Sequence, residues 1–129
     1  MAAEISFLGG ELTLKIQHGS TVRTTYTGCY DASDNLITNF TAVRLAIREG
    51  GPDDLALGDV VLALTGTPTA NDSSVTTDGT AITVNISPDD TQTIPANADH
   101  WYQIEADDAN GDTWTIGWGS TRTRWRGAP

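Results

Sequence analysis

The sequence predicts an all-β protein: one immunoglobulin-like antiparallel β-sandwich of about seven or eight strands, with one short helical crossover. Three observations lead to this prediction. Apolar and polar residues alternate with a period of two along most of the chain, as they do in half-buried strands. Turn-forming residues interrupt the alternation at spacings of roughly 8–12 residues. The 129 residues are too few for two cores of ordinary size, so we expect residues 1–129 to form a single domain.

In the first half of the chain, the alternation predicts strands at residues 12–16, 21–30 and 41–49, and a weaker strand within 55–64. In the third of these strands, Val43, Leu45 and Ile47 should point inward, and Arg44 and Arg48 outward. The polar run at 31–35 is typical of a turn, because short polar side chains bond their own backbone. Residues 65–74 read as a long loop within the domain.

In the second half, residues 75–77 and 81–86 predict a hairpin around Asp78-Gly79, since this dipeptide tolerates positive φ. Ser87 followed by Pro88 and two acids predicts a helix start, which makes a short crossover between sheets. Further strands are expected at 101–106, 113–118 and 120–126, with a turn at Asn110-Gly111. Alternation also places Trp114, Ile116 and Trp118 on one face of their strand.

The net charge of −10 arises from 17 acidic and 7 basic residues. A duplex-binding surface replaces phosphate counterions with basic side chains, so we expect no nucleic-acid partner. No run approaches the roughly 20 apolar residues of a membrane span, and the N-terminus lacks the pattern of a signal peptide. With Cys29 as the sole cysteine, synthesis in a reducing cytoplasm is expected.

The sequence offers little catalytic machinery. His18 and His100 could serve a hydrolase with Ser20 or Cys29 as nucleophile, but no nucleophile-elbow pattern accompanies them. We therefore expect no enzyme, no cofactor and no metal. Most acids fall in predicted turns and are expected to be solvated: Asp31, Asp34, Asp53, Asp54, Asp107, Asp108 and Asp112. The turn at 107–112 is rich in oxygen ligands for calcium but lacks the spacing and distal glutamate of an EF-hand, which favours a plain hairpin turn.

The four tryptophans and a basic C-terminal strip are the best candidates for an interface. Trp101 alternates with Tyr102 and Ile104, so it should lie on the outer side of its strand. The last strand carries arginines in alternation around a second tryptophan, and such residues anchor protein interfaces. The candidate interface residues are Trp101, Arg122, Arg124, Trp125 and Arg126.

The order of these features resembles small β-sandwich proteins of tailed-phage virions, and in particular the N-terminal docking domain of baseplate upper proteins. The resemblance runs through Leu12–Val22, the Asp-rich turn at 31–35 and the strand Thr41–Arg48. It continues through Ile86–Thr91, the strand and turn Trp101–Gly111, and Thr115–Arg124. The three alternating arginines do not map onto the family pattern.

The resemblance implies a non-enzymatic structural protein of the virion, either a capsid decoration or cement protein or a tail or baseplate adaptor. Its partners would be the major capsid protein or tail and baseplate subunits, with self-association open, and no nucleic acid or membrane. The acidic loops 50–54 and 65–74 would then face solvent or a basic partner. An alternative is a carbohydrate-binding module that uses exposed tryptophans. A small hydrolase or inhibitor is a third possibility, but the sequence shows no pattern of a catalytic cleft.

Overall fold

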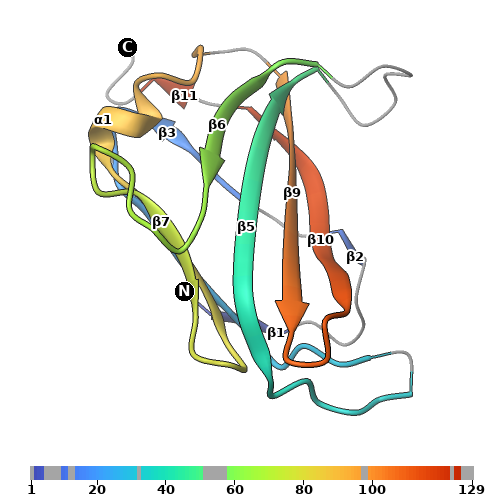
Figure 1. Cartoon of the computed structure of the whole chain (residues 1–129). Helices are drawn as coiled ribbons and strands as arrows, with labels where there is room; N and C mark the ends of the chain where they lie inside the picture. The colour runs from blue at the N-terminus through green and yellow to red at the C-terminus, as the bar shows by residue number, and fades with distance from the viewer. Residues whose placement is uncertain are drawn as a thin grey trace.

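The computed structural model describes residues 2–4, 10–11, 14–31, 33–50, 58–96, 99–122 and 124–125, with side chains from Leu14 to Gly119 within these ranges. Most of this part is β-structure, as predicted (Figure 1). The strands are β1 (Ala2–Glu4), β2 (Gly10–Glu11), β3 (Gln17–His18), β4 (Val22–Thr27), β5 (Phe40–Glu49), β6 (Val60–Leu64), β7 (Ser74–Thr77), β8 (Ile82–Ile86), β9 (Asp99–Asp108), β10 (Thr113–Arg122) and β11 (Arg124–Trp125). The described part has one helix, α1 (Pro88–Thr91).

The long strands form two sheets with the orders β1-β4-β8-β7 and β2-β10-β9-β5-β6. All pairs between strands of four or more residues are antiparallel, whereas β1 on β4, β2 on β10 and β11 on β3 are parallel. Figure 1 shows the two sheets as separate layers that face each other. The all-β class is therefore confirmed. Eleven strands are described, more than the expected seven or eight, because four strands of two or three residues add to the seven that have four residues or more.

The buried apolar residues form one cluster shared by both sheets. The predicted inward sides of the central strands are confirmed, since Val43, Leu45 and Ile47 of β5 and Tyr102 and Ile104 of β9 are buried. From the opposite sheet, β4, β7 and β8 contribute Val22, Tyr26, Val75, Ile82, Val84 and Ile86. Burial of apolar surface at about 25 cal/mol per Å² makes this shared core the main source of stability.

Two predicted strands differ in extent from their patterns. Residues 21–30 form a strand only over Val22–Thr27, because Gly28 turns the chain with a φ of 65°. Leu14 and Ile16 are buried as expected, but they precede the two-residue strand β3 instead of lying in a longer one. Alternation thus predicted which side chains are buried, while backbone hydrogen bonding decided where strands begin and end.

A β-bulge in β10 overturns the predicted face of its tryptophans. Trp114 pairs with Ala106 and Thr115 with Glu105, but the next pair is Gly117 with Ile104, which leaves Ile116 as the extra residue. An extra residue reverses the alternation of every side chain that follows it. Trp114 therefore packs against the core, whereas Trp118 lies opposite Gln103 on the outer side of the sheet.

The predicted hairpin and crossover are both confirmed. β7 and β8 pair around Asp78-Gly79, and Gly79 has a φ of 110°. Ser87 caps α1 by accepting a hydrogen bond from the backbone N–H of Asp90, and Pro88 opens the helix. Because α1 follows β8 of one sheet and precedes β9 of the other, it carries the chain across the core (Figure 1).

The loop at 65–74 is held by a buried carboxylate, which the sequence did not indicate. Asp90 of α1 is only 5% exposed. Its two oxygens accept hydrogen bonds from the hydroxyl of Thr69 at 2.6 Å and the amide of Asn71 at 3.0 Å. The Thr69 hydroxyl also accepts the backbone N–H of Ser73. Rather than extending free into solvent, the segment 69–73 is therefore clamped onto the crossover helix.

Burial raises the pKa of Asp90, but hydrogen bonds from Asn71, Ser73 and Thr69 outweigh it and hold the pKa below its ordinary value of 3.8. A carboxylate whose folded-state pKa is lowered stabilises the fold above its ordinary pKa. This contribution is lost as the pH falls through the lowered folded-state value.

We expect Asp90→Ala to reduce the free energy of unfolding by about 2 kcal/mol near neutral pH, because it removes the buried acceptor of the hydrogen bonds from Thr69 and Asn71. Chemical denaturation measures this difference, and it should shrink as the pH is lowered below the ordinary carboxyl pKa. Asp89→Ala is the matched control, since Asp89 is exposed in the same helical turn. Equal losses for both variants would contradict the clamp.

Candidate docking face

The outer side of the five-stranded sheet is the best candidate for a binding surface. Strand register places its residues in rows that run across β10, β9, β5 and β6. One row joins Trp101 to Arg48 and Val60, and the next joins Trp118 to Gln103, Ala46 and Ala63. The following rows hold Thr115, Glu105 and Arg44, and then Thr113, Asp107 and Ala42. We call these four rows the docking face.

A pair of tryptophans dominates one end of the docking face. The ring centroids of Trp101 and Trp118 are 5.3 Å apart, and the rings are tilted by 32°. Both side chains are partly exposed. Val60 lies in the row of Trp101 but on the far side of Arg48, and at 44% exposure it is one of two large apolar side chains described as exposed. Aromatic and apolar side chains therefore lie on either side of Arg48, and tryptophan and arginine are enriched at protein interfaces.

A hollow of about 290 Å³ lies over β5 and β6 on the same face, and Gln103 and Arg48 separate it from the tryptophan pair. Ala46 and Ala63 line it, and because both are small they leave space above the sheet. Gln103, Arg44 and Arg48 also line it. The Arg48 guanidinium donates a hydrogen bond to the carbonyl of Gly58 at 3.3 Å, which orients the side chain.

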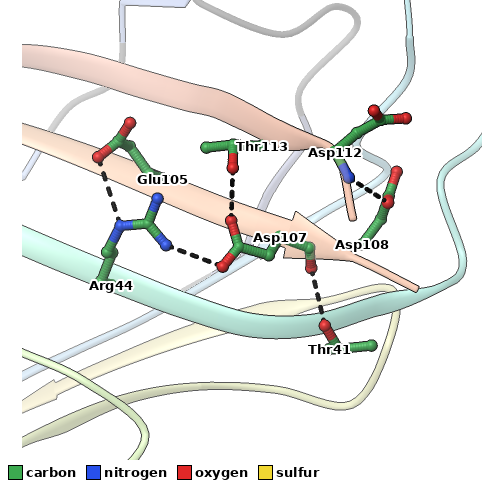
Figure 2. A network of polar contacts seen from close by, with 7 residues as sticks. All are labelled: Thr41, Arg44, Glu105, Asp107, Asp108, Asp112 and Thr113. Carbon is green, nitrogen blue, oxygen red and sulfur yellow. Dashed lines mark hydrogen bonds and ion pairs between the residues drawn. The ribbon is translucent and has the colours of Figure 1, made fainter. Parts of the chain in front are cut away.

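At the other end of the face, Arg44 lies between two carboxylates (Figure 2). Its Nε is 3.4 Å from Glu105 Oε1, and its Nη1 is 3.1 Å from Asp107 Oδ2. The Thr113 hydroxyl donates to the other oxygen of Asp107 at 2.8 Å. Hydrogen bonds from Thr113 and then Arg44 lower the pKa of Asp107. This end of the face therefore holds one arginine and two carboxylates, a net formal charge of −1.

Asp108 contradicts the expectation that acids of the 107–112 turn are solvated. Its side chain is buried at 7% exposure. One oxygen accepts the indole N–H of Trp114 at 2.9 Å, and the other accepts the backbone N–H groups of Asn110 and Asp112. Figure 2 shows the bond from Asp112. The indole hydrogen bond is the largest influence, and it lowers the pKa of Asp108 despite burial. Asp108 therefore bonds both the backbone of the predicted Asn110-Gly111 turn and the Trp114 side chain of the following strand.

No group of three or more histidine, cysteine, aspartate or glutamate side chains in the described ranges is arranged to hold a metal ion. The carboxylates considered as calcium ligands, Asp107 and Asp108, are bonded to side chains and backbone of their own hairpin and to Arg44.

The outer side of the four-stranded sheet has a different character. Its described rows join Thr25, Thr83 and Thr76, and then Arg23, Asn85 and Ser74. The Thr25 and Thr83 hydroxyls lie 3.2 Å apart, and Arg23 donates to Asn85 at 3.2 Å. Apart from Arg23 these are small polar residues, and they include no aromatic side chain. Of the two outer faces, only the docking face therefore combines aromatic, apolar and arginine side chains among the described residues.

The predicted interface residues are only partly brought together. Trp101 lies on the outer side of β9, as its alternation predicted. The backbone of Arg122 pairs with Asp99 at the end of β10, one row beyond Trp101. Arg124 and Trp125 form β11, which pairs with β3 and not with β9. The side chains of Arg122, Arg124 and Trp125, and all of Arg126, lie outside the described residues, as do the acids of the 51–57 segment.

The residues considered for catalysis lie apart from this face. The His18 ring donates to the carbonyl of Gln92 at 3.1 Å, which ties β3 to the crossover. His100 is buried. Cys29 is fully buried, and burial raises the pKa of its thiol to about 11. A thiol with this pKa is protonated at neutral pH and is therefore a poor nucleophile.

Sequence reasoning missed Trp118, Arg48 and the two alanines of the hollow as parts of one surface. The outward position of Arg48 was predicted, and it could have been linked to Trp101 by aligning the two alternating strands. Trp118 could not have been found this way, because the bulge in β10 leaves no clear signal in the alternation.

No family model and no curated protein matches this chain. In the described residues, no helix is long and apolar enough to cross a membrane.

We expect Asp108→Asn to lower the melting temperature, because an amide cannot accept from both Trp114 and the turn backbone as a carboxylate does. The destabilisation should be largest near neutral pH and should fade as the pH drops through the lowered pKa of Asp108. Thermal unfolding followed by tryptophan fluorescence measures it. Asp112→Asn is the matched control, since Asp112 engages this turn through its backbone N–H, and an equal loss there would contradict the role of Asp108.

Proposed function

We propose that this protein is a non-enzymatic structural protein of a tailed-phage virion that docks to symmetric neighbouring subunits through the docking face. The observation that carries the docking role is the Trp101–Trp118 pair on the same sheet face as an alanine-lined hollow. Aromatic anchors and arginines supply most of the binding energy at protein interfaces. The virion setting rests on the resemblance of the chain's motifs to baseplate docking domains.

The sheet orders support an immunoglobulin-like topology for this domain. In that fold, one sheet has the order A-B-E-D and the other contains G-F-C. The order β1-β4-β8-β7 corresponds to the first, and β10-β9-β5 corresponds to the second. The crossover α1 then joins strands E and F, as such a sandwich requires. Domains of this kind serve widely as docking modules, because a rigid sheet face holds its anchors in place.

Many copies arranged on a closed lattice would make a weak individual contact effective through avidity. A capsid decoration or cement role and a tail or baseplate adaptor role both fit this mechanism. Copy number separates the two, because capsids present hundreds of equivalent positions and tail structures far fewer. Quantitative mass spectrometry of purified virions against the major capsid protein measures this number, and absence from virions would contradict the proposal.

A carbohydrate-binding module is the alternative that the tryptophans favour. Sugar rings stack on the open faces of aromatic side chains. Here each indole lies against the other, so the pair presents one compact patch in place of a platform for successive sugars. The geometry therefore favours a protein anchor. Saccharide binding by the isolated protein on a glycan array would reverse this preference.

We expect Trp101→Ala to reduce incorporation into particles at least about tenfold, because it removes half of the aromatic anchor. Co-purification with virions, quantified by mass spectrometry, measures incorporation. Thr76→Ala on the exposed side of β7 is the control and should incorporate normally. Normal incorporation of Trp101→Ala in a folded protein would exclude the docking face as the virion contact.

We also expect the double variant Arg122→Glu with Arg124→Glu to retain the fold and lose incorporation, because arginine forms bidentate contacts that glutamate repels. Circular dichroism checks the fold, and the same co-purification checks incorporation. A folded double variant that incorporates normally would remove these arginines from the interface.

A further inference from the structure

We propose that the occupant of the docking face is a second copy of this chain, related by a twofold axis that runs parallel to β5 and β9 and passes between them. This inference rests on the proposed docking role and names the partner of the same surface. The inference follows from the register of the sheet. In each row, the side chains of β5 and β6 on one side of the axis complement those of β9 and β10 on the other. Twofold interfaces require this kind of self-complementarity.

The axis places β5 of each copy over β9 of the other. In the row of Arg44 and Glu105, the guanidinium of each copy then meets the carboxylate of its partner. In the row of Ala46 and Gln103, a small side chain meets a longer one. In the third row, Arg48 of each copy lies over Trp101 of the other, a cation–π arrangement that arginine favours. All three contacts occur twice, once on each side of the axis.

The outer strands complete the fit. Trp118 on β10 and Ala63 on β6 belong to the row of Ala46 and Gln103, on opposite sides of the axis. Trp118 of each copy therefore faces the alanine-floored hollow of the other. Sheets packed face to face lie about 10 Å apart, which requires small residues opposite large ones. The projecting tryptophan and the hollow supply this match of shape.

Charge also selects this face for contact between identical chains. Each copy carries a net charge of −10, so two copies repel each other over most of their surface. Within the four rows of the docking face, however, the charged side chains are Arg44, Arg48, Glu105 and Asp107, and their formal charges cancel. Two acidic copies can therefore approach at this face without the repulsion that opposes contact elsewhere.

The face is modest in size. Four strands at about 4.8 Å spacing and rows spanning roughly 20 Å present on the order of 400 Å² of flat area per copy. This belongs to the small class of specific interfaces. We therefore expect a reversible dimer that forms at roughly 10–500 µM in solution and is reinforced where copies are held side by side.

Sedimentation velocity on the full chain over a range of concentrations up to about 1 mM tests the proposal. The wild type should shift from monomer to dimer. Ala63→Trp fills the hollow and should weaken dimerisation at least about tenfold, whereas Thr76→Trp on the opposite sheet should not change it. A wild type that stays monomeric at the highest concentration, or equal weakening by both variants, would overturn the proposal.

A charge exchange tests the geometry itself. Arg44→Glu and Glu105→Arg should each weaken homodimers, because like charges then meet across the axis. Mixing the two variants should restore association as a heterodimer, which native mass spectrometry distinguishes from either homodimer. Absence of the heterodimer would overturn the proposed axis.

These outcomes are distinct from those of the docking role. A chain that stays monomeric but still enters virions through Trp101 would overturn self-association and leave docking in place. A chain that dimerises but is absent from virions would overturn the virion role and leave self-association in place.

Discussion

The antiparallel pairing of β5 with β9 is the constraint on which the rest of the structure depends. These two ten-residue strands lie at the centre of the five-stranded sheet, and their register sets both of its sides. On the inner side it places Val43, Leu45 and Ile47 against the core. On the outer side it aligns Arg48 with Trp101 and Arg44 with Glu105. A slip of one residue would exchange the two sides, so the buried residues that stabilise the fold also fix the outer rows.

Two carboxylates of this acidic chain hold loops in place by accepting hydrogen bonds. Asp90 and Asp108 are buried, and each accepts several hydrogen bonds. Asp90 accepts them from the 69–73 loop, and Asp108 from Trp114 and the turn before it. Buried charges are costly unless hydrogen bonds compensate for them. Here short polar side chains and backbone N–H groups provide that compensation. The result is that loops at both ends of the sandwich are tied to the sheets by single acidic residues.

The two outer faces divide the surface by chemistry. The outer face of the four-stranded sheet carries mainly threonine and other polar side chains, some of which bond each other, as Thr25 and Thr83 do. The docking face keeps aromatic and apolar groups partly exposed, and its described charges cancel. An exposed patch of this kind is unfavourable in water unless something covers it. This contrast, more than any single residue, directs the proposals of docking and of self-association to the five-stranded sheet.

From its sequence alone, this chain could be assigned to the all-β class, because period-two alternation reports directly which side chains are buried. The hairpin at Asp78-Gly79 and the crossover helix capped by Ser87 could be predicted for the same reason: their signals are local, set by φ preferences and by hydrogen bonds a few residues apart. The outward position of Trp101 could also be predicted locally, from the alternation of residues 101–106.

Only the tertiary structure decided which distant residues meet. The bulge at Ile116 places Trp118 on the outer side, beside Trp101. The bulge depends on pairing with β9, and the residues around it do not predict it. The burial of Asp90 under Thr69 and Asn71 likewise joins segments about twenty residues apart. Such contacts arise from strand register and loop packing, which are properties of the whole fold and not of any short stretch of sequence.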